Sequence, residues 1–240
     1  MQVQSYNQSN WIELHHISKK YHFQPVIDDL NMTIEAGQIC ILVGANGAGK
    51  TTLLRIIAGL TRPNSGEILI GGSLIGTTPA IRNRIGYVGH QSMFYQDLSA
   101  EENLWHYARI YQVPRPENKV HHSLQAAGLF QHRNKPVRIF SHGMQQRLSL
   151  VRALLHEPNI LLLDEPFAGL DQEAIQFLNE QITQLKKQGA TVLLVMHQPH
   201  PMLGVATHIA WLKDGKISHH IPITRLNDTP DLRAYLQESR

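Results

Sequence analysis

The most regular feature of the hydrophobic pattern is a set of short, uninterrupted apolar runs. They lie at Ile39–Val43, 160–163 and 191–196. An uninterrupted apolar run is typical of a strand in a parallel sheet that is covered on both faces, because neither side of the strand meets water. Segments with helical spacing separate the runs, so the pattern predicts an α/β fold with a mainly parallel core sheet.

One helical segment, 174–187, has apolar residues three or four positions apart. A helix would bring them to one face, namely Ile175, Leu178, Ile182 and Leu185. Gly189 follows at a point where a helix commonly stops, since glycine adopts the left-handed conformation without strain. We expect this segment to be a crossover helix between two parallel strands.

Other regions depart from this pattern. Residues 11–15 and 209–217 read as antiparallel strands, the second folded about the hairpin dipeptide Asp214-Gly215. Between about 92 and 150 the strand signals vanish, and Ser99 with Glu102 three positions later forms a capping box, which marks a helix start. The sequence therefore predicts a single domain over 1–240, with an antiparallel β subdomain and a helical subdomain at about 92–150 inserted in the core.

Composition narrows the class of protein. The 240 residues with 42% hydrophobic content suffice for one substantial core. A net charge of +3 is too small an excess for a nucleic-acid-binding face, so no nucleic-acid partner is expected. The single cysteine, Cys40, lies in an apolar run, which predicts a buried thiol in a chain without disulfides. The 15 histidines are scattered without cysteine or carboxylate at zinc-site spacing, so no histidine metal site is expected.

The sequence also bears on the membrane. No apolar run approaches the roughly 18 to 20 residues that a membrane-spanning helix needs. Residues 1–10 are polar and lack the basic and apolar regions of a secretory signal. We therefore expect a cytoplasmic chain whose work on a membrane goes through another chain.

A glycine-rich loop follows the first apolar run directly. It consists of Gly44, Ala45, Asn46, Gly47, Ala48, Gly49, Lys50 and Thr51, and Thr52 continues into a helical segment. A loop of this pattern between a strand and a helix binds phosphates. Its backbone N–H groups surround the β-phosphate, Lys50 reaches the β- and γ-phosphates, and Thr51 is placed to bind Mg²⁺. The sequence therefore predicts a P-loop NTPase fold.

The run at 160–163 ends in two adjacent carboxylates, Asp164 and Glu165. Charges at the end of a buried strand are costly unless a cation or a substrate uses them. We expect Asp164 to hold Mg²⁺, mainly through water, and Glu165 to polarise the water that attacks the γ-phosphate. The alternative is a pair of solvated loop acids, which the phosphate loop in the same chain disfavours.

Further motifs follow in a definite order. They are Tyr21, Gln91, Ser141 and Gly143 within 140–147, Asp171 at the end of 168–171, and His197 after the last apolar run. On these motifs and the phosphate loop, the sequence resembles the ABC ATPase family over nearly its whole length. In that family the positions correspond to an adenine-stacking aromatic, the Q-loop, the signature, the D-loop and the switch histidine. Each residue alone is a weak signal, and the order and spacing of the set carry the resemblance.

The resemblance implies a role for each of these residues. Tyr21 would stack on the adenine of ATP, and Glu165, His197 and Gln91 would act in hydrolysis. Gln91 would join Thr51 and Asp164 around Mg²⁺. The cofactors implied are therefore ATP and Mg²⁺.

The resemblance also implies partners. In the family, two ATPase subunits form a head-to-tail dimer, homo- or heterodimeric, that sandwiches two nucleotides. Ser141 and Gly143 would then complete the ATP site of the opposite subunit, and Asp171 of the D-loop would be a further nucleotide-binding residue. Here His142 replaces the first glycine of the usual signature pair and Met144 the usual glutamine. The ATPase would energise separate transmembrane transporter subunits and lie peripherally on the cytoplasmic face of the cell membrane.

The direction of transport and the cargo rest on a narrower similarity. Residues 87–91, 98–104, 165–167 and 197–198 resemble the exporter-type ATPase of cytochrome c maturation, a haem-exporter-like system, and multidrug-type export ATPases share much of this pattern. Two other classes are weighed. A soluble ABC ATPase acting on nucleic acid or ribosomes would carry a long coiled coil or a second cassette, and a P-loop kinase or switch outside the ABC family would lack the signature.

Overall fold

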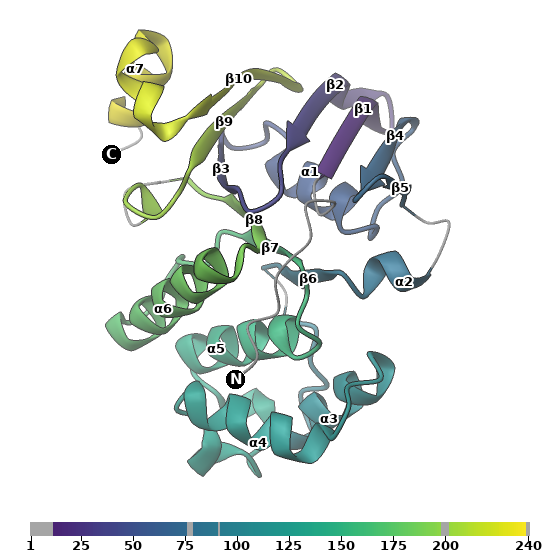
Figure 1. Ribbon diagram of the computed structural model, residues 1–240, viewed down its shortest axis with the longest axis vertical. Helices are drawn as coiled ribbons and strands as arrows, with labels where there is room; N and C mark the ends of the chain where they lie inside the picture. The colour runs from purple at the N-terminus through teal and green to yellow at the C-terminus, as the bar shows by residue number, and fades with distance from the viewer. Residues whose placement is uncertain (1–11, 76–78, 91, 198–201, 239–240) are drawn as a thin grey trace.

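The structure, a computed structural model, describes residues 12–75, 79–90, 92–197 and 202–238 (Figure 1). Six strands form the core sheet in the order β10-β9-β3-β8-β7-β6. In that order they span Lys216–Pro222, His208–Lys213, Ile39–Val43, Thr191–Val195, Ile160–Asp164 and Ile85–Val88. The pairs from β9 to β6 are parallel, and β10 pairs antiparallel with β9. The predicted α/β fold with a mainly parallel core sheet is therefore confirmed.

The three apolar runs are strands of this sheet. The first has the predicted bounds as β3, the second extends to Asp164 as β7, and the third ends at Val195 as β8. The hairpin about Asp214-Gly215 is also present, with positive φ at both residues, 49° and 75°. One expectation was incomplete, because β9 pairs in parallel with β3 on its other side and so belongs to the core sheet.

A second sheet is entirely antiparallel, in the order β2-β1-β4-β5. Its strands span Gln24–Ile34, Ile12–Tyr21, Ser65–Ile70 and Ser73–Leu74. Trp11, where the sequence predicts a strand to begin, lies outside the described residues, and β1 continues well past His15. The pairing of β1 and β2 shifts register near His16 and Asp29, which have φ values of 52° and 49°. These irregularities interrupt the alternation by which a strand is recognised in a sequence.

The helices divide between the two sides of the core sheet. Helix α1 (Lys50–Ile57) lies between the sheets, and α2 (Pro79–Arg82) is a single turn beside them (Figure 1). The stretch from 100 to 154 holds α3 (Ala100–Ile110), α4 (Pro116–Ala126) and α5 (His142–Leu154), with short 3₁₀ turns at Phe130–His132 and Val137–Ile139. Helix α6 (Gln172–Gln188) covers the sheet, and a turn at Ile223–Asp228 leads into α7 (Pro230–Glu238).

Both faces of the core sheet are buried. Along β3, Ile39, Ile41 and Val43 pack with the residues of α3 to α7, whereas Cys40 and Leu42 pack with α1 and the antiparallel sheet. All five residues of β3 have no exposed surface. The strand that precedes the phosphate loop is thus fixed between two apolar cores.

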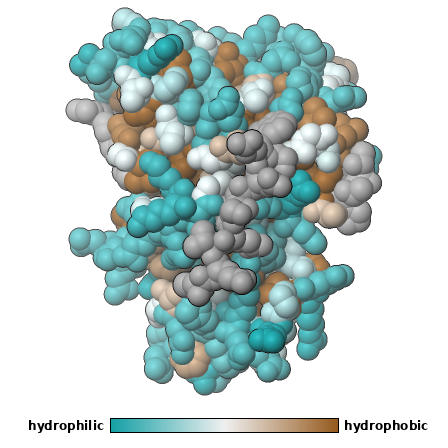
Figure 2. Space-filling model, viewed as in Figure 1, coloured by the Kyte–Doolittle hydropathy of each residue, from teal (hydrophilic) through white to brown (hydrophobic). Residues whose placement is uncertain are grey.

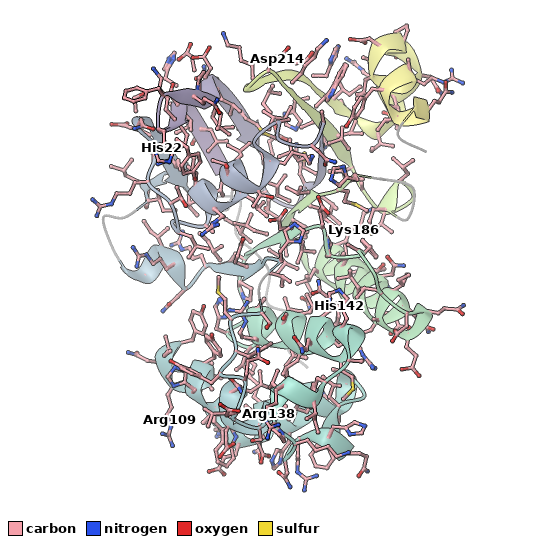
Figure 3. The ribbon with its side chains drawn as sticks, turned by 180° about the vertical axis from the view of Figure 1, so that it is seen from behind. His22, Arg109, Arg138, His142, Lys186 and Asp214 are labelled. Carbon is pink, nitrogen blue, oxygen red and sulfur yellow. The ribbon has the colours of Figure 1, made fainter. Side chains whose placement is uncertain are left out.

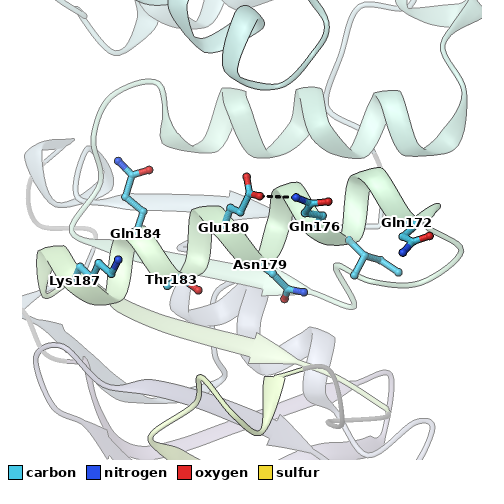
Figure 4. Close-up of a pocket in the computed structure, with 8 residues that line it drawn as sticks. Gln172, Gln176, Asn179, Glu180, Thr183, Gln184 and Lys187 are labelled. Atoms are coloured by element: carbon cyan, nitrogen blue, oxygen red, sulfur yellow. Dashed lines mark hydrogen bonds between the residues drawn. The ribbon is translucent and has the colours of Figure 1, made fainter.

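Local signals begin and end the helices as the sequence predicts. Helix α3 starts with the capping box, in which Glu102 N donates to Ser99 Oγ at 3.1 Å and Ser99 N donates to Glu102 Oε2 at 2.8 Å. Helix α6 ends at Gly189, which adopts φ 77°. Its inner face buries Phe177 and Leu178. Its outer face carries exposed polar side chains such as Gln176 and Glu180, and Gln176 Nε2 donates to Glu180 Oε1 at 2.8 Å (Figure 4).

The helical stretch is joined to the core sheet by Arg152 of α5, whose exposed fraction is 5%. Its guanidinium donates to Tyr87 O of β6 at 2.8 Å and lies over the rings of Phe94 and Tyr107. Burial lowers the pKa of Arg152, and the neighbouring tyrosines oppose that effect. One buried cation thus ties α5 to the strand that precedes residue 91.

The surface shown in Figure 2 is mostly hydrophilic, with apolar side chains in separate patches. Within the described ranges, none of the helices combines the length and the apolar character that crossing a bilayer requires. The same residues contain no cluster of three or more His, Cys, Asp or Glu side chains that could hold a metal ion.

Candidate active site

The functional segments meet because neighbouring parallel strands end at the same edge of the sheet. The carboxyl end of β3 leads into the phosphate loop, that of β7 into Glu165, that of β8 toward His197 and that of β6 toward His90. Ligands of open α/β sheets bind at this edge. Residues that lie far apart in the chain therefore line one site.

Close packing fixes the start of the phosphate loop. A Cβ atom added at Gly44 would lie 2.4 Å from Leu212 O, a backbone atom of β9. At the other end of the loop, Gly49 has φ 102°, and a Cβ there would lie 2.9 Å from Val26 O. Only glycine fits at either position. The loop is thus held between β9 and β2 before α1 begins.

Lys50, the cation of the loop, is buried, with an exposed fraction of 6%. Its Nζ donates to Gly44 O at 2.6 Å and to Ala45 O at 3.0 Å. Burial lowers the pKa of Lys50, while the carboxylates of Glu165 and Asp164 raise it. The Lys50 side chain therefore folds back over the phosphate loop, with its ammonium group near the carboxylates of Asp164 and Glu165.

Thr51 and Asp164 form the contact expected of a divalent-cation site. Thr51 Oγ1 donates to Asp164 Oδ1 at 3.1 Å, and Asp164 has an exposed fraction of 2%. Asp164 Oδ2 is buried without a hydrogen-bond partner among the described residues, and His90 Nε2 lies 3.9 Å from it. Burial raises the pKa of Asp164. The hydrogen bond from Thr51 and the charges of His90 and Lys50 act in the opposite direction and lower it. A hydroxyl beside an unsatisfied carboxylate oxygen fits the oxygen donors that Mg²⁺ prefers.

Glu165 and His197 form a second polar pair, with Nε2 and Oε1 2.8 Å apart. Glu165 leaves the strand with φ 49°, and its N–H donates to Val195 O, the last residue of β8, at 2.9 Å. The side chain is thereby directed toward the end of the neighbouring strand rather than along its own. The sequence predicts both residues for the site but not their contact.

Two cavities flank residues 45 and 46 of the phosphate loop. The larger, of about 590 Å³, is also lined by Glu165, His197 and Tyr235 of α7. The smaller, of about 470 Å³, is also lined by Trp211, the turn at Asp214 (Figure 3) and, again, Tyr235. A nucleotide has space on either side of this part of the loop.

The signature and D-loop residues contact each other within the chain. Ser141 Oγ accepts from Met144 N at 3.2 Å and caps α5. Gly143 is buried, and a Cβ there would lie 2.7 Å from the carboxylate of Asp171, which caps α6 by accepting from Ala174 N at 2.8 Å. His142 Nε2 lies 3.1 Å from Ala168 O (Figure 3). Neither Ser141 nor Gly143 lines the two cavities beside the phosphate loop of its own chain.

Two predicted residues remain, Tyr21 and Gln91. Tyr21 ends β1 with an exposed fraction of 45%, and Lys19 Nζ lies 5.1 Å from its ring centroid. It lines neither cavity. Gln91 lies outside the described residues, so its expected contact with the cation stays a prediction.

Two residues of the site were not predicted from the sequence. His90, next to Gln91, faces Asp164, and its position beside a motif residue was a usable signal. Tyr235 lines both cavities from the far end of the chain, and no motif marks it.

Comparisons with known proteins identify the family of this chain. Residues 27–168 match the family model described as ABC transporter. The bacitracin transport ATP-binding protein BcrA of Bacillus licheniformis is 36% identical over 212 residues, which are 88% of this chain and 69% of that protein. A solved ATP-binding subunit of an ABC transporter superposes with a TM-score of 0.86 at 29% identity, covering 95% of this chain and 98% of that one.

A second solved structure is an ATP-binding cassette in a dimeric post-hydrolysis state bound to ADP and Pi. It superposes with a TM-score of 0.78 at 26% identity and covers 88% of this chain and 98% of that one. The fold, the order of the motifs and these matches lead to one conclusion. The chain belongs to the ABC transporter family, as an ATP-binding subunit with the ATPase fold and activity of that family.

Proposed function

We propose that this ATPase binds ATP with Mg²⁺ at the carboxyl edge of the core sheet and uses its hydrolysis to drive a separate membrane-spanning partner. The observation that carries the proposal is the meeting of two pairs, Thr51 with Asp164 and Glu165 with His197, beside the buried Lys50. Together they supply a phosphate cradle, a cation site and a base.

Binding is assigned to the phosphate loop, Gly44 to Thr52. Its backbone N–H groups and the N-terminus of α1 hold the phosphates, and Lys50 exchanges its contacts with Gly44 O and Ala45 O for phosphate oxygens. Mg²⁺, when bound, neutralises charge that develops on the β- and γ-phosphates. Thr51, Gln91 and the unsatisfied oxygen of Asp164 are the groups proposed to hold it. The exposed face of Tyr21 is proposed to stack on adenine.

Hydrolysis is assigned to Glu165, which accepts a hydrogen bond from the attacking water and polarises it. His197, 2.8 Å away, holds the carboxylate in place and is close enough to the larger cavity to meet the γ-phosphate. Gln91 is proposed to orient the same water. As the water oxygen bonds to the γ-phosphorus and the bond from the γ-phosphorus to the β–γ bridging oxygen breaks, the Glu165 carboxylate takes up the proton that the water loses. Removing the charge of Glu165 should therefore stop the chemical step and spare binding.

The functional unit is proposed to be a head-to-tail dimer of ATPase subunits, identical or not. Ser141 and Gly143 lie away from the chain's own cavities, and the N-terminus of α5 offers free N–H groups for a phosphate held by a second subunit. Asp171, packed against Gly143, sets the distance between α5 and α6. A solved relative of this fold is dimeric with ADP and Pi, which supports the proposal.

The partner is proposed to be one or more transmembrane transporter subunits, which contact the helical subdomain at about 92–150. Tyr95 and Ile110 of this stretch are apolar yet 55% and 57% exposed. The ATPase would then lie in the cytoplasm, peripherally on the inner face of the cell membrane. We propose export as the direction, with a haem-exporter-like system of cytochrome c maturation as the finer assignment. Its support is the resemblance of residues 87–91 and 98–104.

Glu165→Gln tests the composite site. The variant keeps the shape of the side chain and loses the charge, so it should bind ATP, hydrolyse it at least about a hundredfold more slowly, and elute as a dimer in size-exclusion chromatography with MgATP. Glu117→Gln, on the exposed surface of α4, is the matched control and should behave as wild type.

A second substitution separates the dimer from the phosphate loop. Adding Ser141→Arg to Glu165→Gln should place bulk at the contact with the second nucleotide and dissolve the dimer. A Glu165→Gln protein that binds ATP normally yet remains monomeric would refute the composite site. Wild-type turnover in that variant would refute the role of Glu165.

A further inference from the structure

Helix α7 is docked against the edge of the core sheet by three kinds of contact. Leu232 and Leu236 are buried in the apolar core, with exposed fractions of 0% and 7%. The ring of Tyr235 stacks on Trp211 of β9, with centroids 5.1 Å apart and an interplanar angle of 26°. Asp231, in the first turn of α7, pairs with His219 of β10 at 3.7 Å. The helix therefore has an anchor that does not depend on Tyr235.

The residue under Tyr235 belongs to the support of the phosphate loop. Trp211 is paired across the sheet with Val43, the residue directly before Gly44. The next residue, Leu212, presents its carbonyl oxygen to Gly44 so closely that no Cβ fits between them. The stack of Tyr235 on Trp211 thus joins α7 to β9, the strand whose backbone packs against the start of the loop.

Tyr235 also reaches the loop's open side. It lines both cavities that flank Ala45 and Asn46, the one shared with Glu165 and His197 and the one shared with Trp211. Ala45 and Asn46 are exposed, so the ring that lines both cavities limits the space into which these two residues can move. Backbone N–H groups that must surround a phosphate bind it best when their positions are set in advance.

We propose that Tyr235 is a positioning residue of the ATPase, which holds residues 45 and 46 of the phosphate loop in the conformation that accepts the nucleotide. The inference rests on the proposed function, because it takes this loop as the phosphate site. It adds that α7, which carries none of the family motifs, is part of the nucleotide-binding apparatus. A displacement of α7 would thereby weaken nucleotide binding without any change in the motif residues.

The test compares three variants of α7 in the full chain. Tyr235→Ala should raise the dissociation constant for a fluorescent ATP analogue with Mg²⁺ roughly threefold to tenfold, the range that loss of one aromatic contact supports. Tyr235→Phe keeps the ring and should bind as wild type. Arg233→Ala, on the exposed side of the same helix, is the matched control and should also bind as wild type.

Steady-state kinetics provide the readout that a merely structural role would not give. In Tyr235→Ala the KM for ATP should rise in parallel with the dissociation constant, while kcat at saturating ATP stays within about twofold, because uniform binding is lost and the reacting groups are untouched. If Tyr235→Ala does not fold, Tyr235→Leu replaces it, since leucine fills part of the space without stacking on Trp211.

The outcomes are distinguishable. Wild-type affinity in Tyr235→Ala, a loss in Tyr235→Phe as large as in the alanine variant, or a fall in kcat without a change in KM would each overturn the positioning role. Lys50→Ala is measured beside them and should lose tight nucleotide binding. If Lys50→Ala binds normally, the phosphate site itself is wrong. If only Lys50→Ala loses binding, the proposed function stands and the inference about Tyr235 fails.

Discussion

His197 Nε2 lies 2.8 Å from Glu165 Oε1, although the two residues follow different strands of the core sheet. The contact arises because Glu165 turns out of β7 with positive φ and bonds through its N–H to the last residue of β8. The proposed base and its partner are therefore placed by the pairing of β7 with β8, not by their spacing in the chain.

His197→Ala removes this contact and leaves the phosphate loop intact. We expect phosphate release to slow by about a hundredfold, the scale of a correctly placed acid–base group, while the dissociation constant for ATP changes by less than about threefold. Phosphate release and equilibrium binding measure the two quantities. His122→Ala, exposed on α4, serves as the control, and equal losses of binding and turnover would contradict the assignment.

Gly44→Ala tests the packing that fixes the start of the loop. A methyl group there would lie 2.4 Å from Leu212 O. Because Leu212 O is a backbone atom of β9 in the core sheet, the clash is relieved only if β3 and β9 move apart. We expect a loss of about 2–4 kcal/mol in the free energy of unfolding. Chemical denaturation measures it, with Gly204→Ala as the control, because a Cβ at Gly204 has no atom within 4 Å. Equal stability of the two variants would show that β9 is not fixed against the loop.

The stability of the protein should fall between pH 6.5 and 4. Burial lowers the pKa of His156 to about 4, while its ring stacks on Tyr111 and its Nε2 lies 3.2 Å from Ile85 O. In the unfolded chain His156 takes up a proton near pH 6.5, as an ordinary histidine does. In the folded chain His156 takes it up only near pH 4. The unfolded state therefore gains protons first on acidification, and this contribution to stability is lost as the pH falls.

His156→Phe keeps the stacked ring and cannot titrate. The midpoint of urea unfolding should depend less steeply on pH between 6.5 and 4 in this variant than in wild type. Burial also lowers the pKa values of His208 and His220, so part of the dependence should remain. His122→Phe is the matched surface control. Parallel curves for His156→Phe and wild type would exclude His156 as the source.

Cys40 should be inert in the folded protein. It has no exposed surface, and burial raises the pKa of its thiol to about 12. Since the thiolate is the reactive form, a maleimide should not label the native chain at pH 8 but should label it fully in denaturant. Mass spectrometry after timed exposure measures this. Rapid labelling of the native protein would mean that β3 is not enclosed between the two cores.

The core sheet was predictable because burial on both faces leaves a simple signal in the sequence. The run 39–43 appears as β3 without change, and α6 has its stop at Gly189. Strand β2 was not predicted, because it pairs with β1 through register shifts at residues of positive φ, which no alternation of polar and apolar positions records. Ile175, expected on the buried face of α6, is only half-buried and lines the larger cavity, while Phe177 lies in the core.

The candidate site was predictable only where a motif marks it. Lys50, Asp164 and Glu165 follow apolar runs, and their place at the strand ends follows from the order of the elements. The contact of Gly143 with Asp171 depends on how α5 and α6 pack, and the position of Tyr235 depends on where α7 returns to the sheet. Neither is encoded locally, since tertiary packing decides both.

The order of strands in the core sheet has a consequence for how the protein acquires its activity during folding. Strand β3, which leads into the phosphate loop, is synthesised before its two neighbours in the sheet, β8 and β9, which follow it much later in the sequence. Pairings between such distant segments form slowly, because a long loop must close before any contact compensates for its entropy. The phosphate loop is therefore synthesised well before the strands that hold it. In refolding experiments, we expect nucleotide affinity to return with the slowest phase rather than with the first helical signal.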